Sequence, residues 1–283
     1  MKIKETTLWQ FLKILPKKKL SRLVFELTHT PFPKELLHSL IRLYSWYFQV
    51  NLEEAIIPRG GFSTFSQFFS RHLKEGARRI DPRKEIWVSP CDGKIYSFGT
   101  LKEGMKIEQI KGWDYTLEEL LGGREWNSTF QKGFYITLYL SPKDYHRFHA
   151  PMSGTLEKVR HISGEFWPVN PLALSRLPQL FCRNERVILE VFSPFGPYLM
   201  VFVAALNVGS IHLHPIPKLK TNRRTRKIDI LLPSLLVSKG EELGYFEMGS
   251  TIILILPSGF QRSSLLEKGK SIQMGMPLGK VEK

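Results

Sequence analysis

The chain has 283 residues, of which 42% are hydrophobic and 24% charged, and its formal net charge is +15. This length and composition support one large or two ordinary folded cores and argue against disorder, whereas the basic excess is typical of proteins that bind nucleic acid or an anionic membrane surface. No apolar run reaches the roughly 18 to 20 residues that cross a bilayer, and no cleavable leader is recognisable, so we expect a protein that neither spans a membrane nor is exported.

Residues 1–58 are predicted to form an amphipathic helical region. Apolar residues follow helical spacing in three segments that prolines separate. Basic residues alternate with them, a composition typical of helices at a membrane interface. The alternative is that the apolar stripes pack on the main domain, and both hold if one face docks while another contacts lipid. The apolar positions are Leu8, Phe11, Leu12, Leu15, Leu20, Leu23, Val24, Leu27, Leu36, Leu37, Leu40, Ile41 and Tyr44, and the basic ones Lys13, Lys17, Lys18, Lys19, Arg22, Lys34 and Arg42.

Residues 59–283 are predicted to form a β-rich body. Short apolar runs lie between clusters of Gly, Pro and Asn, as in strands joined by turns. The predicted fold class is therefore α+β, with a barrel-like or sandwich-like catalytic body behind the helical region. The clearest predicted strands are residues 134–140, 186–192, 198–206 and 251–256.

Candidate catalytic side chains follow these runs. "SPCDGKI" places Asp92 before a glycine, which ordinarily indicates an Asp-Gly turn. "SPKDYHRFHAP" follows a predicted strand, so His146 and His149 fall on a strand-end loop, where functional residues concentrate. Two histidines three residues apart also suit zinc, but the remaining candidates lack a recognisable ligand spacing, so no metal site is predicted. These candidates are His161, His212 and His214.

Near the C-terminus, "EMGSTIILILP" places a glycine and a serine at the mouth of a buried strand. Gly249 allows another group to approach the backbone closely, a setting that suits a reactive Ser250. A turn into a strand is the simpler interpretation of this tripeptide alone. Together, however, the chain offers an Asp, a His and a Ser on three separate strand-end turns, the components of a carboxylate-oriented imidazole that activates a hydroxyl.

Several ordered motifs closely resemble the pyruvoyl-dependent phosphatidylserine decarboxylases. The resemblance covers roughly residues 62 to 283. Met248 stands where leucine is common in that family, and the basic stretch 218–227 departs from the family pattern. The matching motifs are "FSTFSQFFSRHLKEGARRI", "SPCDGKI", "DYHRFHAP", "NPLALSRLPQLFCRNERV", "ALNVGSIH" and "KGEELGYFEMGST".

The resemblance implies that Asp92, His149 and Ser250 form a self-processing triad that breaks the chain between Gly249 and Ser250. The products are a large β chain, residues 1–249, and a small α chain, residues 250–283. Ser250 becomes a pyruvoyl group, the covalent cofactor. Phosphatidylserine then forms a Schiff base with it and loses CO2 to give phosphatidylethanolamine, and His146 assists this decarboxylation.

The same resemblance implies the partners and the location. We expect phosphatidylserine as substrate, an anionic membrane surface at the cytoplasmic face of the bacterial cell membrane, association of the cleaved α and β chains, and a homodimer, but no nucleic acid. Cys91 and Cys182 form no CxxC pair and are expected to be reduced thiols. The stretch 218–227 is either a solvated loop or a contact to anionic headgroups.

Two other function classes compete with this interpretation. A serine hydrolase with the same Asp, His and Ser would keep an intact chain, although no Gly-x-Ser-x-Gly motif surrounds Ser250. A non-enzymatic basic protein that binds membrane or nucleic acid would leave the ordered motifs unexplained. Denaturing electrophoresis separates the three classes, because only self-processing yields two fragments.

Overall fold

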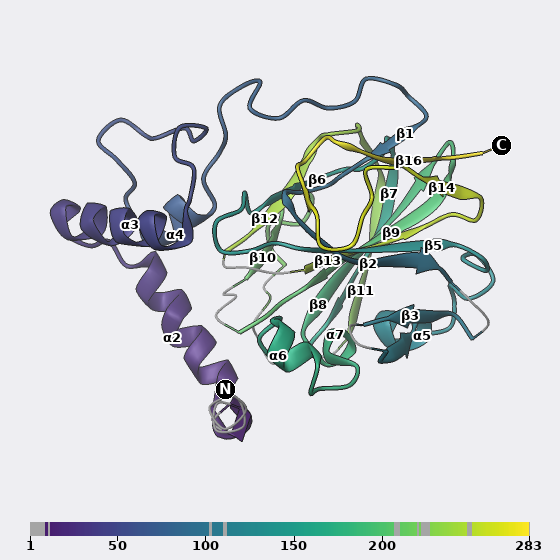
Figure 1. Cartoon of the computed structure of the whole chain (residues 1–283), viewed down its shortest axis with the longest axis horizontal. Helices are drawn as coiled ribbons and strands as arrows, with labels where there is room; N and C mark the ends of the chain where they lie inside the picture. The colour runs from purple at the N-terminus through teal and green to yellow at the C-terminus, as the bar shows by residue number, and fades with distance from the viewer. Residues whose placement is uncertain are drawn as a thin grey trace.

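The computed structural model describes residues 9–10, 12–101, 104–109, 112–206, 210–219, 221, 227–247 and 251–282. Helices lie mainly at the N-terminal end and strands fill the rest of the chain (Figure 1). The helices are α2 Lys17–His29, α3 Lys34–Phe48, α4 Phe65–Phe69, α5 Leu117–Leu121, α6 Pro171–Leu174 and α7 Leu180–Arg183. The strands are β1 Ile86–Val88, β2 Gly93–Thr100, β3 Lys106–Glu108, β4 Asp114–Thr116, β5 Phe134–Tyr139, β6 Arg147–His149, β7 Gly154–Ile162, β8 Arg186–Ser193, β9 Gly196–Val203, β10 Ile211–Leu213, β11 Ile228–Val237, β12 Glu242–Phe246, β13 Thr251–Leu256, β14 Phe260–Arg262, β15 Ser271–Ile272 and β16 Pro277–Val281.

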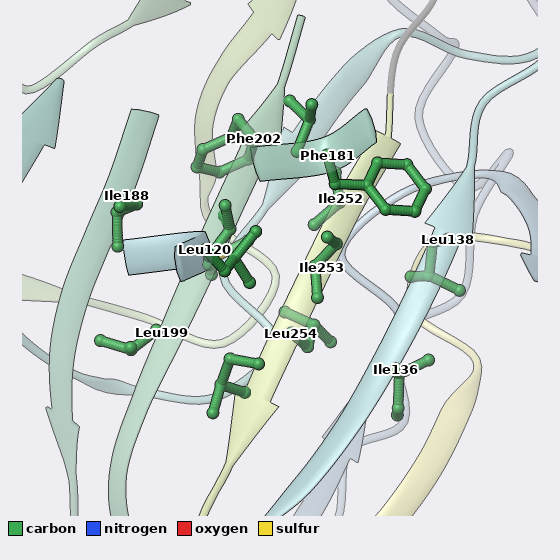
Figure 2. Close-up of a cluster of buried hydrophobic side chains, with 14 of the residues drawn as sticks. Leu120, Ile136, Leu138, Phe181, Ile188, Leu199, Phe202, Ile252, Ile253 and Leu254 are labelled. Carbon is green, nitrogen blue, oxygen red and sulfur yellow. The ribbon is translucent and has the colours of Figure 1, made fainter. Parts of the chain in front are cut away.

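An eight-stranded antiparallel sheet forms the centre of the body, in the order β11-β7-β8-β9-β13-β5-β2-β15. β13 is buried along its whole length because it is almost entirely β-branched or leucine and has a paired strand on each side. Figure 2 shows Ile252, Ile253 and Leu254 of β13 among side chains of the neighbouring strands, where Leu120 of α5 and Phe181 of α7 join the same hydrophobic cluster.

Three smaller antiparallel sheets flank the central sheet: β1-β16-β14, β10-β12-β6 and β3-β4. In the second of these, β12 pairs with β6, so that Glu242 lies opposite His149 and Tyr245 opposite Arg147. Since β12 and β13 are consecutive strands in different sheets, residues 248–250 connect the small sheet to the middle of the large one.

The N-terminal helices pack partly on the body and partly on a cluster of their own. Trp9 lies 5.6 Å from Trp167 of the body between ring centroids, and the Lys17 ammonium lies 3.8 Å from the Trp167 ring centroid. Farther along, Leu37 and Ile41 of α3 form a second hydrophobic cluster with Phe62 and Phe68. One stripe of these helices is therefore buried, and the opposite faces are exposed.

The structure confirms the predicted α+β class and the predicted strands, within a few residues at their ends. In the part of the chain that is described, the large sheet ends at β11 and β15 and does not close into a barrel. The predicted division after residue 58 stays a prediction, because the second cluster joins α3 on one side of it to residues 62–68 on the other. Among the described helices, none has the length and apolar character to span a bilayer.

Candidate active site

Asp92 lies on the bend directly before β2. Its neighbour Gly93 has to be a glycine because a Cβ atom there would lie 2.6 Å from the backbone oxygen of Tyr139 on β5. The Asp-Gly pair therefore marks a close approach of two paired strands. Asp92 is 6% exposed, so its carboxylate requires partners within the protein.

The partners of the Asp92 carboxylate are an arginine and a backbone amide. Arg78 Nε donates to Oδ1 at 2.9 Å and Arg78 Nη2 donates to Oδ2 at 2.5 Å, a bidentate pair. The Met274 amide adds a bond of 2.9 Å to Oδ1. Arg78 also forms an ion pair with Glu54 at 2.8 Å. This network joins the segment before β1, the start of β2 and the C-terminal part of the chain.

His149 ends β6 and is 7% exposed. Its Nδ1 lies 2.9 Å from the Gly240 carbonyl oxygen, and its Nε2 lies 3.1 Å from the Tyr145 hydroxyl. A carbonyl only accepts, so in the neutral ring Nδ1 carries the proton and Nε2 carries the lone pair. Burial lowers the pKa of His149. The ring is therefore a neutral base whose reactive nitrogen is Nε2.

The expected contact between Asp92 and His149 does not form in this structure. Asp92 instead accepts from Arg78 and Met274, while the Gly240 carbonyl holds the ring nitrogen that the carboxylate was expected to hold. The physical reason is the bidentate guanidinium, which satisfies both carboxylate oxygens. The two segments still touch, because the His149 amide donates to the Pro90 carbonyl at 2.8 Å.

His146 is completely buried, and its ring lies 4.1 Å from the Phe69 ring between centroids, tilted by 42°. Its Nδ1 donates to the Asp144 carbonyl at 2.8 Å, whereas its Nε2 has no hydrogen-bond partner among the described residues. Burial, assisted by the charge of Arg71, lowers the pKa of His146 to about 3. His146 therefore presents a neutral ring whose Nε2 lone pair is available.

Gly249 and Ser250 lie outside the described residues, as does Met248. The structure does fix the residues on either side of them. The Phe246 amide donates to the His146 carbonyl at 2.9 Å, and Thr251 begins β13 opposite Tyr139 and Val203. The described chain therefore leaves the backbone of His146 at Phe246 and resumes at Thr251, four residues beyond Glu247, in the middle of the large sheet.

Sequence reasoning missed several residues of this region. Tyr145 and Arg71 lie inside motifs quoted above, and the available signal was the position of Tyr145 directly before His146 and of Arg71 in the motif that begins at residue 62. Gly240 acts through its backbone carbonyl, for which the residue type carries no signal. Within the described part of the chain, no group of three or more His, Cys, Asp or Glu residues is arranged to hold a metal ion.

Comparisons of the chain with a family model and with individual proteins point to the same family. A family model described as phosphatidylserine decarboxylase matches residues 65–280. A protein named phosphatidylserine decarboxylase proenzyme from Myxococcus xanthus is 36% identical over 278 residues, which cover 98% of this chain and 99% of the relative. Proteins of the same name from Marinobacter nauticus and Brevibacillus brevis are 37% and 38% identical, covering 95% and 93% of this chain and 95% and 94% of the relatives.

Proposed function

Since the chain belongs to the phosphatidylserine decarboxylase family, we propose that it is a proenzyme that cleaves itself and then converts phosphatidylserine to phosphatidylethanolamine and CO2. The observation that carries the proposal lies on either side of positions 248–250: β12, which ends at Phe246, pairs with the strand that carries His149 and hydrogen-bonds the His146 backbone, and the buried strand β13 begins at Thr251. Two buried neutral imidazoles, those of His146 and His149, therefore belong to the strand and loop that pair with β12, just before the proposed nucleophile in the chain.

Self-cleavage begins with Ser250 Oγ, which attacks the Gly249 carbonyl while a base takes its proton. We assign the base to His149, because Nε2 of its neutral ring bears the lone pair and its hydrogen-bond partner among the described residues, Tyr145, can move aside. The acyl group moves from nitrogen to oxygen, and elimination of the resulting ester releases residues 1–249 as a carboxylate. The remaining dehydroalanine tautomerises and takes up water, and ammonia leaves to give the pyruvoyl group at position 250.

The residues around position 250 fit such a group. Thr251 Oγ1 is fully buried and has no partner among the residues described, so it is a free donor at the base of β13. The pyruvoyl group supplies a ketone that accepts the electrons released as CO2 leaves. His146 is proposed to exchange a proton with the α-carbon of the substrate through Nε2, its unpartnered ring nitrogen.

We propose that Asp92 supports cleavage at a distance, by fixing the loop that hydrogen-bonds the His149 backbone. Asp92 also acts on the His149 ring by its charge, which favours the imidazolium formed when Ser250 loses its proton.

Replacement of Ser250 tests the proposal directly. Ser250→Ala is expected to leave one full-length, folded chain without decarboxylase activity, because alanine cannot attack Gly249 and cannot become a ketone. Wild type should give two chains on a denaturing gel, and the mass of the small chain should match residues 250–283 with an N-terminal pyruvoyl group. Two chains in the alanine variant, or an intact active wild type as a serine hydrolase would show, would overturn this mechanism.

We further propose peripheral binding at the cytoplasmic face of an anionic membrane. The outward faces of α2 and α3 carry large apolar side chains beside basic ones, a combination that binds the bilayer interface. The two cysteines are free thiols, consistent with a reducing compartment. The exposed apolar residues are Leu23, Leu27, Leu36, Leu40, Leu43, Trp46 and Tyr47.

A homodimer remains part of the proposal, as the family resemblance implies. Its support in the structure is the edge strand β11, on which Leu231 is 78% exposed and Leu236 77% exposed. Apolar side chains on an open sheet edge favour pairing with another chain.

A further inference from the structure

Arg71 follows α4 and is 4% exposed, yet its guanidinium is poorly satisfied. Nη2 donates to the carbonyls of Lys143 and Asp144 at 3.0 and 3.4 Å. Nε and Nη1 are buried and have no hydrogen-bond partner among the described residues. No carboxylate of those residues lies within ion-pair distance of Arg71, whereas the half-buried Arg78 pairs with Glu54 and Asp92.

A buried cation without a directly paired counter-ion is unfavourable, because negative charges that it does not contact offset its desolvation only in part. Burial correspondingly lowers the pKa of Arg71. A guanidinium stays charged in proteins and offers donors in a fork that matches an oxyanion. Two free buried donors on such a fork therefore indicate a missing anionic ligand.

The surroundings of Arg71 show which way that ligand would lie. On one side, Arg71 Nη2 and His146 Nδ1 both donate to the Asp144 carbonyl, so the guanidinium adjoins the proposed proton-transfer residue. On the other side, the Arg71 guanidinium carbon lies 5.6 Å from the Phe68 ring centroid, and the Phe68 ring contacts the Tyr44 ring at 5.8 Å between centroids.

Tyr44 and Phe65 line an apolar groove of about 480 Å³ between α2, α3 and α4. Leu40 and Leu43 of α3 lie along the same groove. Cavities of this size and character accommodate apolar parts of ligands. The apolar groove therefore adjoins the buried guanidinium of Arg71 on one side, and His146 adjoins the same guanidinium on the other.

We propose that Arg71 binds the phosphodiester of the phospholipid substrate and thereby positions its headgroup at His146. The proposal rests on the proposed decarboxylation of phosphatidylserine. The order of surfaces matches the order of groups along that lipid: acyl chains, phosphodiester and serine. Arg71 is accordingly a binding and positioning residue, and His146 faces the reacting carbon.

The serine carboxylate is the other oxyanion of this substrate. A guanidinium paired with it would stabilise the charge that decarboxylation has to remove, and so would oppose the reaction. The phosphodiester keeps its charge throughout, so its contact with Arg71 contributes equally to the ground state and the transition state. Loss of such a contact raises KM and leaves kcat nearly unchanged.

The test compares processed wild type with Arg71→Gln, Arg71→Lys and the control Lys74→Gln, which removes an exposed charge three residues away. With dihexanoylphosphatidylserine as substrate, Arg71→Gln is expected to raise KM about 30-fold or more and to change kcat less than threefold. Arg71→Lys should recover part of the loss because it keeps the charge, and Lys74→Gln should match wild type. An unchanged KM, or a loss confined to kcat, would overturn the assignment to the phosphodiester.

A second measurement uses only the wild-type enzyme, in case the Arg71 variants do not fold. Dihexanoylphosphatidylglycerol carries the phosphodiester without the serine carboxylate or amine, so it cannot form a Schiff base, and dihexanoylglycerol lacks the phosphodiester as well. The first should compete with substrate at least about 30-fold more strongly than the second. Equal competition would exclude phosphodiester recognition. A wild-type chain that neither cleaves nor releases CO2 would instead refute the proposed function, so the two failures are distinguishable.

Discussion

His149 is held by a backbone carbonyl and a phenol, and this pairing fixes its proton on Nδ1. The carboxylate of Asp92 is occupied by Arg78 and influences the ring by charge and through the shared backbone contact at Pro90. Because burial lowers the pKa of His149, the ring remains a neutral base through the neutral pH range.

The pH dependence of self-cleavage should report this state. A base works only when it is unprotonated, and a lowered pKa moves its protonation to more acidic pH, so the cleavage rate should be flat above neutrality and fall with a midpoint below 6.5. Chains made in a cell-free reaction and transferred to buffers of different pH would give the rates by gel densitometry. His149→Ala should abolish the pH-dependent reaction. A midpoint at or above 6.5 would contradict the assignment of a buried neutral His149 as the base.

At the level of single residues, the sequence allowed Asp92, His146 and His149 to be selected because they lie in motifs that resemble those of a family. It could not predict that Gly240 would hold His149, since any residue provides a backbone carbonyl. Nor could it predict the free donors of Arg71, which depend on contacts with a loop 72 residues farther along the chain.

Helix α2 is linked directly to the segment that precedes the proposed cleavage site. His29, the last residue of α2, lies with its Nε2 2.9 Å from Glu247 Oε1. Glu247 is 4% exposed and also lies 2.8 Å from His212 Nε2. The hydrogen bond to Glu247 raises the pKa of His29. An ion pair thus connects helix α2 to the segment just before the proposed cleavage site.

We expect His29→Ala to slow self-cleavage, because Glu247 loses one of the groups that hold it two residues before Gly249. The raised pKa means that the ion pair is complete below about pH 6.5 and is lost as pH rises through the folded-state pKa. The ratio of wild-type to variant rates should therefore be largest near pH 6, at up to about fivefold for a partly exposed pair, and approach one near pH 9.

The control is His38→Ala, which removes an exposed histidine of α3. Equal rates for wild type and His29→Ala at pH 6, or the same loss in His38→Ala, would show that the contact at Glu247 has no part in cleavage.

Among the elements, apolar runs made β5, β8, β9 and β13 predictable. Strands that are buried on both faces consist mostly of apolar residues, so their sequences stand out. β7 and β11 were not predicted, although they pair over most of their length. β11 lies at the edge of the sheet and β7 lies next to it, so both strands are partly exposed. Their sequences therefore mix polar and apolar residues, as the sequences of loops do.

Over the whole molecule, charge and apolar exposure coincide at the N-terminal helices. Lys18, Lys19 and Arg22 are exposed on α2, beside the outward-facing Leu23 and Leu27. The helices project from the body in Figure 1, so that these side chains can meet a flat surface. A net charge of +15 favours approach to an anionic bilayer, and the helices provide the apolar part of the contact.

Replacing Lys18, Lys19 and Arg22 by glutamine should weaken binding to anionic vesicles. Each basic residue near such a surface contributes on the order of 1 kcal/mol, so the triple variant should bind roughly 100-fold more weakly at low salt. At 1 M salt, where the Debye length is about 3 Å, the difference should nearly vanish. Vesicle co-sedimentation measures both. The control replaces Lys84, Lys132 and Lys280, three exposed lysines of the body; an equal loss there would mean that net charge alone governs binding.

The position of β13 determines how the two products of the proposed cleavage relate to each other. Residues 250–283 contribute the strand between β9 and β5, and β15 and β16 pair with β2 and β1 of the larger product. Breaking the peptide bond before Ser250 severs the covalent link but none of these ladders. The two products would therefore be parts of one folding unit, and separating them would mean unfolding the protein. The proposed self-cleavage would thus leave a small product that is held to the large one by the strand pairs of a shared sheet.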